Sequence, residues 1–152
     1  MKRVQFIKSV GKGVVFVCAG SCMMSACSTS DDEAPINGNN NPPPTSGTRV
    51  SVNLSSIPNV GDQTTKSRIL FIRVGAGNSS SDFIATEAIC PHQGGNLAWI
   101  NNEEIIECQL HFAQYEPDGD VIRGPQNSSG NTRDLQIYST TIANGEITAT
   151  VA

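Results

Sequence analysis

The chain has 152 residues, of which 38% are apolar and 16% are charged. This balance suits one domain of ordinary size and excludes a coiled coil or a highly charged disordered chain. The 14 glycines and 8 prolines favour short strands and turns over long helices. The net charge of −4 at pH 7 argues against a nucleic-acid partner, because phosphate backbones are bound by clustered Lys and Arg.

The first 27 residues have the pattern of an export signal. Residues 1–12 carry four basic residues and no acid, and residues 13–26 are uncharged and mostly apolar. This pattern is typical of a secretory signal peptide, and a single membrane-spanning helix is the alternative. The end of the stretch, Met24-Ser25-Ala26-Cys27, resembles the lipobox of bacterial lipoproteins, and Cys22 is a weaker candidate. The resemblance implies a lipoprotein signal peptide, lipid on Cys27, and a place in the cell envelope, either periplasmic or at the outer membrane or surface.

Residues 28–47 are predicted to form a disordered tether. They include an acidic run, Asp31-Asp32-Glu33, and a proline run, Pro42-Pro43-Pro44, with Ile36 as their one large aliphatic residue. Such a segment cannot bury enough apolar surface to offset its ordering entropy. The acidic run resembles the surface-export signal of some Gram-negative lipoproteins, and a plain solvated linker is the alternative.

The chain after the signal is acidic. Residues 28–152 hold 6 Lys and Arg against 14 Asp and Glu, a net charge of −8. An acidic surface repels nucleic acid and anionic membrane. We therefore expect any docking partner to present a basic face.

Residues 48–152 predict an all-β domain. Hydrophobic runs and alternating patterns bounded by Gly, Asn, Asp and Ser are typical of short strands. The sequence Asn144-Gly145 suits a type I′ hairpin turn. No segment keeps a helical period, so an antiparallel sandwich or small barrel is expected. The expected strands are 49–52, 68–74, 83–89, 104–107, 120–123, 135–138, 141–143 and 146–151.

Two cysteines and two histidines form paired motifs. The first is Cys90-Pro91-His92, and after fifteen residues the second is Cys108-Gln109-Leu110-His111. These are the only histidines of the chain, and each lies within three residues of a cysteine. The segment between the motifs contains a strand signal and Asn101-Asn102, so it can fold back and bring the two loops together.

Four interpretations of these residues compete. Cys90 and Cys108 could form a disulfide in an oxidising compartment, which leaves both histidines unexplained. The four side chains could bind structural zinc, although mixed Cys–His pairs differ from the usual zinc spacings. They could form a nucleophilic Cys–His pair, which does not account for the duplication. They could hold a [2Fe–2S] cluster, with both cysteines on one iron and both histidines on the other.

Cys-x-His, fifteen to seventeen residues, Cys-x-x-His resembles the Rieske iron–sulfur signature. The resemblance extends from about residue 50 to 151, with cluster-binding loops at about 88–126. It implies a Rieske-like antiparallel β-sandwich with a subdomain formed by two loops and one [2Fe–2S] cluster per subunit. It also implies that Cys90, His92, Cys108 and His111 are the ligands, and that Pro125 lies in a loop that covers the cluster.

The sequence departs from the quinol-oxidising branch of that family. The two extra cysteines of that branch, which form a disulfide, are replaced by Gly95 and Leu110. Its hydrogen-bonding serine is replaced by Ala113, whereas Tyr115 matches the tyrosine that donates to a ligand sulfur and tunes the potential. Because donors to cluster sulfurs stabilise the reduced state, losing one lowers the potential. The pattern is closer to ferredoxins that feed ring-hydroxylating oxygenases.

The resemblance implies one-electron transfer by a membrane-tethered Rieske ferredoxin-like protein. It implies a redox protein partner in the cell envelope and a lipid anchor in the membrane. The alternatives are a Rieske small subunit of a larger envelope oxidoreductase, as in arsenite-oxidase-like pairs, and a structural-zinc binding module. We find no phosphate loop, nucleophile elbow or substrate-sized group of acids and bases, so we assign no catalytic residue.

Overall fold

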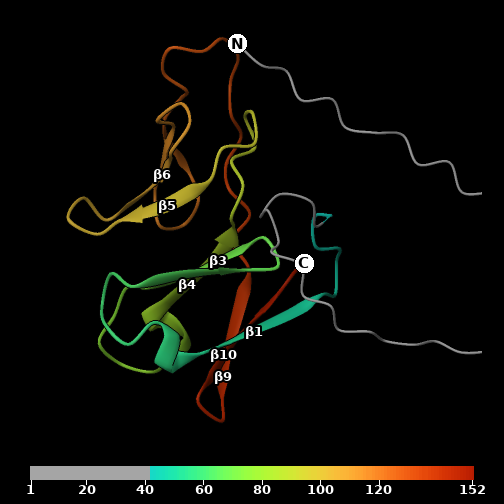
Figure 1. Ribbon diagram of the computed structural model, residues 1–152, viewed down its shortest axis with the longest axis vertical. Coiled ribbons are helices and arrows are strands. Elements are labelled where there is room, and N and C mark those ends of the chain that lie inside the picture. Colours follow the sequence, from blue (N-terminus) through green and yellow to red (C-terminus); the bar gives the residue numbers. More distant parts are fainter. Residues whose placement is uncertain (1–41) are drawn as a thin grey trace, which may run out of the picture. The chain divides into compact units, whose positions relative to one another are not determined.

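The computed structural model describes residues 42–152, and these contain ten short strands and two single-turn 3₁₀ helices (Figure 1). The strands form three antiparallel sheets, with orders β1-β10-β9, β2-β3-β4 and β5-β6-β7-β8. The predicted all-β class is confirmed. The elements are β1 (Arg49–Asn53), η1 (Leu54–Ser56), β2 (Gln63–Lys66), β3 (Ile69–Arg73), η2 (Ser80–Asp82), β4 (Phe83–Glu87), β5 (Leu97–Ile100), β6 (Ile105–Cys108), β7 (Gln114–Tyr115), β8 (Val121–Arg123), β9 (Ser139–Ala143) and β10 (Glu146–Thr150).

The sheet β1-β10-β9 is built around the predicted hairpin. Asn144 and Gly145 both have positive φ, 53° and 78°, as a type I′ turn requires. Along β10, Ile147 and Ala149 are buried, and Thr148 between them bonds through its hydroxyl to Ser51 of β1 at 2.7 Å. This alternation is the period of two that a half-buried strand requires.

The strand β3 links two hydrophobic cores. All five of its residues are buried, and successive side chains point to opposite faces. Leu70 and Ile72 belong to a core that is completed by β5 and β6, whereas Ile69 and Phe71 belong to a second core completed by β1 and β10. In Figure 1, β5 and β6 accordingly lie on one side of β3 and β4, and β1, β9 and β10 lie on the other.

One predicted strand is wrong. Residues 135–138 form no strand, and only Ile137 makes an isolated bridge, to Thr86. Leu135 is buried in the core beside β5 and β6, whereas Tyr138 is buried in the core beside β1 and β10. Because the segment crosses from one core to the other, it cannot keep one face against a single sheet.

The predicted signal peptide, with Cys27, and residues 28–41 of the predicted tether lie outside the described residues. Residues 42–47 precede the first strand, and the Gly47 N–H donates a hydrogen bond to the Val151 carbonyl at 2.9 Å. Among residues 42–152, no helix has both the length and the apolar character needed to cross a membrane.

Candidate metal centre

Two loops that extend from neighbouring strands bring the four predicted ligands together. The first follows β4 and holds Cys90 and His92, and the second joins β6 to β7 and holds Cys108 and His111. Pairing of β5 with β6 places Leu97 opposite Cys108, so the two loops leave the same end of one hairpin. The predicted folding-back of the intervening segment is therefore what the structure shows.

Backbone hydrogen bonds close each loop and join the two. In the first loop, Cys90 N–H donates to the Gly95 carbonyl at 2.7 Å. In the second, Phe112 N–H donates to the Cys108 carbonyl at 2.9 Å. Between them, Gln109 N–H donates to the Asn96 carbonyl at 2.9 Å. The ligand side chains are thus placed by main-chain geometry.

Both site cysteines are free and buried in the core beside β5 and β6. Cys90 is 2% exposed and Cys108 is 1% exposed. Burial raises the pKa of the Cys90 thiol above its ordinary value, because the charged form loses its solvation. A bound cation is what would stabilise a thiolate in this position.

The two imidazole rings pack against each other, and their inner nitrogens are left without hydrogen bonds. Their ring centroids are 5.2 Å apart at 71°, and the Nδ1 atoms of His92 and His111 are buried without a hydrogen-bond partner. Leaving such an atom unsatisfied costs about 1–3 kcal/mol. His92 Nε2 lies 2.9 Å from the Ser129 carbonyl oxygen, which can only accept, so Nε2 carries the proton and Nδ1 presents a lone pair. That lone pair is the donor a metal ion requires.

The ligand types are arranged in like pairs. The Cys108 thiol lies near enough to Cys90 to help raise the pKa of that thiol, and the ring of His111 contacts that of His92. Within residues 42–152, no three or more His, Cys, Asp or Glu side chains are grouped closely enough to hold a single ion. Two separate pairs suit a centre of two metal ions, each with its own kind of ligand, and these residues therefore fit a [2Fe–2S] cluster.

Hydrogen bonds join Tyr115 and the segment 124–132, which we call the cover loop, to three of the four residues. The Tyr115 hydroxyl lies 3.4 Å from Cys90 Sγ. Burial raises the pKa of Tyr115 far above its usual range, so the phenol stays protonated. Pro125 belongs to the cover loop, and the covering role that the family resemblance implies for it stays a prediction. The next residue, Gln126, donates its N–H to the His111 carbonyl at 2.6 Å.

Two cover-loop residues were not predicted from the sequence. Ser129 contacts His92 through its main-chain carbonyl, so its side chain gives no signal. Thr132 places its hydroxyl 2.7 Å from the Tyr115 hydroxyl. Thr132 stands in a polar turn where threonine is ordinary, and its partner is 17 residues away.

Gly95 and Leu110 face each other as the positions of the family disulfide would. A Cβ added at Gly95 would lie 2.5 Å from Leu110 Cβ and 2.8 Å from Cys108 Sγ. The glycine therefore leaves room for the Leu110 side chain and the Cys108 sulfur. The two loops touch at this point without a covalent link.

Comparisons with known proteins agree with this geometry. Residues 53–141 match the family described as the Rieske [2Fe-2S] domain, and the chain belongs to that family. Its cofactor is a [2Fe–2S] cluster, and the predictions of family and cofactor are confirmed.

The curated relatives are longer than this chain. It is 33% identical over 75 residues to the cytochrome b6-f complex iron-sulfur subunit of Chlorobaculum tepidum, covering 49% of this chain and 39% of that protein. It is 38% identical over 48 residues to the cytochrome b6-f complex iron-sulfur subunit 1 of Synechocystis sp., covering 32% and 27%. The matches thus span about two-fifths or less of these relatives.

Among solved structures, the fold resembles that of a chain in the structure described as the reduced complex between oxygenase and ferredoxin in carbazole 1,9a-dioxygenase. The TM-score is 0.51 at 17% identity, with 70% of this chain and 29% of that chain covered. This likeness shows the fold alone. It confirms the predicted Rieske-like arrangement of antiparallel strands.

Proposed function

We propose that the protein is a one-electron carrier tethered by lipid at Cys27 to a membrane of the cell envelope. The observation that carries the redox role is the pairing of two buried free thiols with two imidazoles whose inner nitrogens lack a partner. When bound, the [2Fe–2S] cluster supplies a one-electron couple without converting a substrate. The lipid anchor is supported by the lipobox-like sequence that ends at Cys27.

The two cysteines and the two histidines have different roles in the proposed site. Cys90 and Cys108, which are free and buried, would hold one iron as thiolates, and His92 and His111 would hold the other through their buried, unpartnered Nδ1 atoms. Two ferric ions, two sulfides, two thiolates and two neutral imidazoles carry no net charge. Reduction of a neutral centre is easier than reduction of an all-thiolate one, so imidazole ligation raises the potential.

Electron exchange takes place at the outer edge of His111. The outer nitrogen of His92 is engaged by the Ser129 carbonyl, whereas no residue of the described part of the chain bonds to the His111 ring. Leu110 and Phe112 flank His111 and are 50% and 46% exposed. Two large apolar side chains beside this half-buried proposed ligand form a surface from which a docked partner would exclude water.

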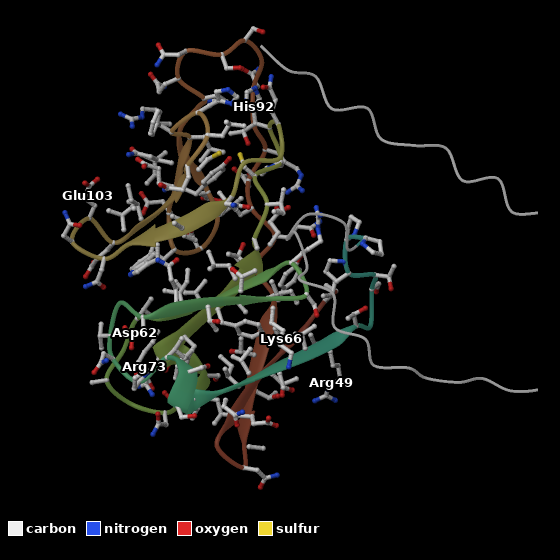
Figure 2. The ribbon with its side chains drawn as sticks, viewed as in Figure 1. Arg49, Asp62, Lys66, Arg73, His92 and Glu103 are labelled. Carbon is white, nitrogen blue, oxygen red and sulfur yellow. The ribbon has the colours of Figure 1, made fainter. Side chains whose placement is uncertain are left out.

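The partner's face combines an apolar centre with a basic rim. Residues 90–96, 108–112 and 124–132 contain no Asp, Glu, Lys or Arg, so the contact around the imidazoles is uncharged. Figure 2 shows Glu103 on the β5–β6 turn, well separated from His92. The net charge of −8 over residues 28–152 then steers a basic partner, and salt slows association without abolishing it.

A second candidate is a subunit of a larger oxidoreductase. It is favoured by the relatives that are described as subunits of the cytochrome b6-f complex. Purification from the native membrane separates the two functions. A molybdenum or haem subunit that co-purifies in fixed ratio supports the complex, and a protein that elutes alone supports the free carrier.

Anaerobic reconstitution with iron and sulfide tests the proposed site. We expect two iron atoms per chain, a visible chromophore, and a Rieske-type EPR signal after reduction. Cys108→Ser and His92→Cys should both lose that signal, whereas Gln93→Ala, an exposed neighbour, should keep it. A colourless, EPR-silent protein that retains zinc tightly would refute the electron-carrier role and support a structural-zinc module.

A further inference from the structure

The Tyr115 hydroxyl stands between two partners. Cys90 Sγ lies 3.4 Å from it on one side and Thr132 Oγ1 lies 2.7 Å from it on the other. Tyr115 is fully buried, so no bulk water competes for the phenol oxygen. We propose that Thr132 is a positioning residue that raises the midpoint potential of the cluster by acting through Tyr115, an inference that rests on Cys90 being a ligand.

The direction of the two hydrogen bonds follows from the proton count. A cysteine that holds iron is a thiolate and can only accept, so the single phenol proton of Tyr115 goes to Cys90 Sγ. The phenol oxygen then accepts, and the Thr132 hydroxyl donates to it. The Arg133 carbonyl is a rival acceptor for that hydroxyl at 3.3 Å, but the shorter bond is the one to Tyr115.

A donor at the phenol oxygen strengthens the bond beyond it. Hydrogen bonds in a chain polarise one another, and the effect is larger where the local dielectric is low. A stronger O–H···S bond stabilises the reduced cluster, which carries one more negative charge than the oxidised cluster. The Thr132 hydroxyl therefore shifts the potential in the positive direction, by less than the Tyr115 hydroxyl itself does.

The structure fixes Thr132 in this place from both sides. The next residue, Arg133, makes two hydrogen bonds to the carboxylate of Glu87 at the end of β4, at 2.6 and 3.0 Å. On the other side, the cover loop is attached through the bond between the Ser129 carbonyl and His92. Hydrogen bonds on both sides of Thr132 along the chain therefore hold its hydroxyl in place.

The test compares midpoint potentials of the reconstituted full chain. Thr132→Val keeps the shape and removes the hydroxyl, and it should shift the midpoint to a more negative value. Tyr115→Phe should shift it further in the same direction, and the double variant should match Tyr115→Phe alone, because Thr132 acts only through the phenol. Thr132→Ser should restore the original potential.

A distant threonine provides the matched control. Thr140→Val removes a hydroxyl that bonds the Ser80 carbonyl, and it should leave the midpoint unchanged. If Thr132→Val disturbs folding, Thr132→Ala removes the same hydroxyl without the branched side chain and must give the same negative shift.

Two results would overturn the relay. One is a midpoint that does not move in Thr132→Val or Thr132→Ala, and the other is a double variant whose shift equals the sum of the two single shifts. In both cases the unaltered protein still shows its Rieske EPR signal. Loss of that signal in the unaltered protein instead removes the proposed function as a whole.

Discussion

The two loops that carry the proposed ligands pack closely at Gly95, where there is no room for a Cβ atom. An added Cβ would meet Leu110 Cβ at 2.5 Å and Cys108 Sγ at 2.8 Å, whereas ordinary contacts begin at 3.4 Å. In Gly95→Ala the loops must therefore separate by about 0.6–0.9 Å, and overpacking of this kind costs about 1–3 kcal/mol. The thiol that has to move is a proposed iron ligand.

The displacement matters more for the cluster than for the fold. Metal-site geometry must be held within about 0.5 Å, and the required movement of Cys108 exceeds that tolerance. We expect Gly95→Ala to fold with reduced stability and to retain less iron per chain than the unaltered protein.

The neighbouring Gly94 is the matched control. It has φ of +77°, but a Cβ there would meet nothing within 4 Å. Gly94→Ala therefore costs about 1–2 kcal/mol of backbone strain and moves neither Cys108 nor Leu110. The two variants are similar in stability and should differ in iron retention.

Urea unfolding of the metal-free protein, together with iron and sulfide analysis after reconstitution, measures both quantities. The fitted-loop reasoning requires low iron in Gly95→Ala and normal iron in Gly94→Ala. Equal iron content in the two variants would refute it, whatever their stabilities.

Four further predictions concern the midpoint potential and the region between the end of β3 and the start of β4. The midpoint potential should lie in the lower half of the roughly −150 to +300 mV Rieske range. Ala113→Ser should raise it by adding a hydrogen-bond donor. Redox titration tests both, and a midpoint of the unaltered protein above the middle of the range contradicts the first. Arg73→Met should lower the free energy of unfolding in urea by about 3 kcal/mol, because the buried guanidinium donates to the Ile57 carbonyl and to three oxygens of residues 75–78. Hydrogen bonds from Ser79 lower the pKa of Asp82, so its stabilisation is complete above its unfolded pKa and lost as pH falls through the folded value; Asp82→Asn should flatten the acid side of the Tm profile.

That the four predicted ligands lie close together was predictable, because the two cysteines and the two histidines occur in two short motifs. Cys90 and His92 are two residues apart, and Cys108 and His111 are three apart, so each loop carries one residue of each type and the β5–β6 hairpin has only to bring the two loops together. The hairpin at Asn144 was predictable for the same reason, since its positive φ is a local requirement. Strong hydrophobic runs such as 68–74 likewise predicted buried strands.

Short strands that are defined by their partners were not predictable. Neither β2, with the polar sequence Gln-Thr-Thr-Lys, nor the two-residue β7 carries a local pattern of its own, and β5 was also absent from the predicted ranges. They become strands because β3, β6 and β8 offer backbone partners. The wrong strand at 135–138 has the converse cause, because its hydrophobic residues serve two cores instead of one sheet.

The cover loop shows why a site is harder to predict than its ligands. It attaches to His111 through the Gln126 amide and to His92 through the Ser129 carbonyl, and neither atom depends on the side chain that the sequence records. Thr132 reaches the site with its side chain, by way of the Tyr115 hydroxyl. Substitutions at Ser129 that preserve the backbone should therefore leave the cluster intact, whereas removing one hydroxyl at Thr132 should change its potential.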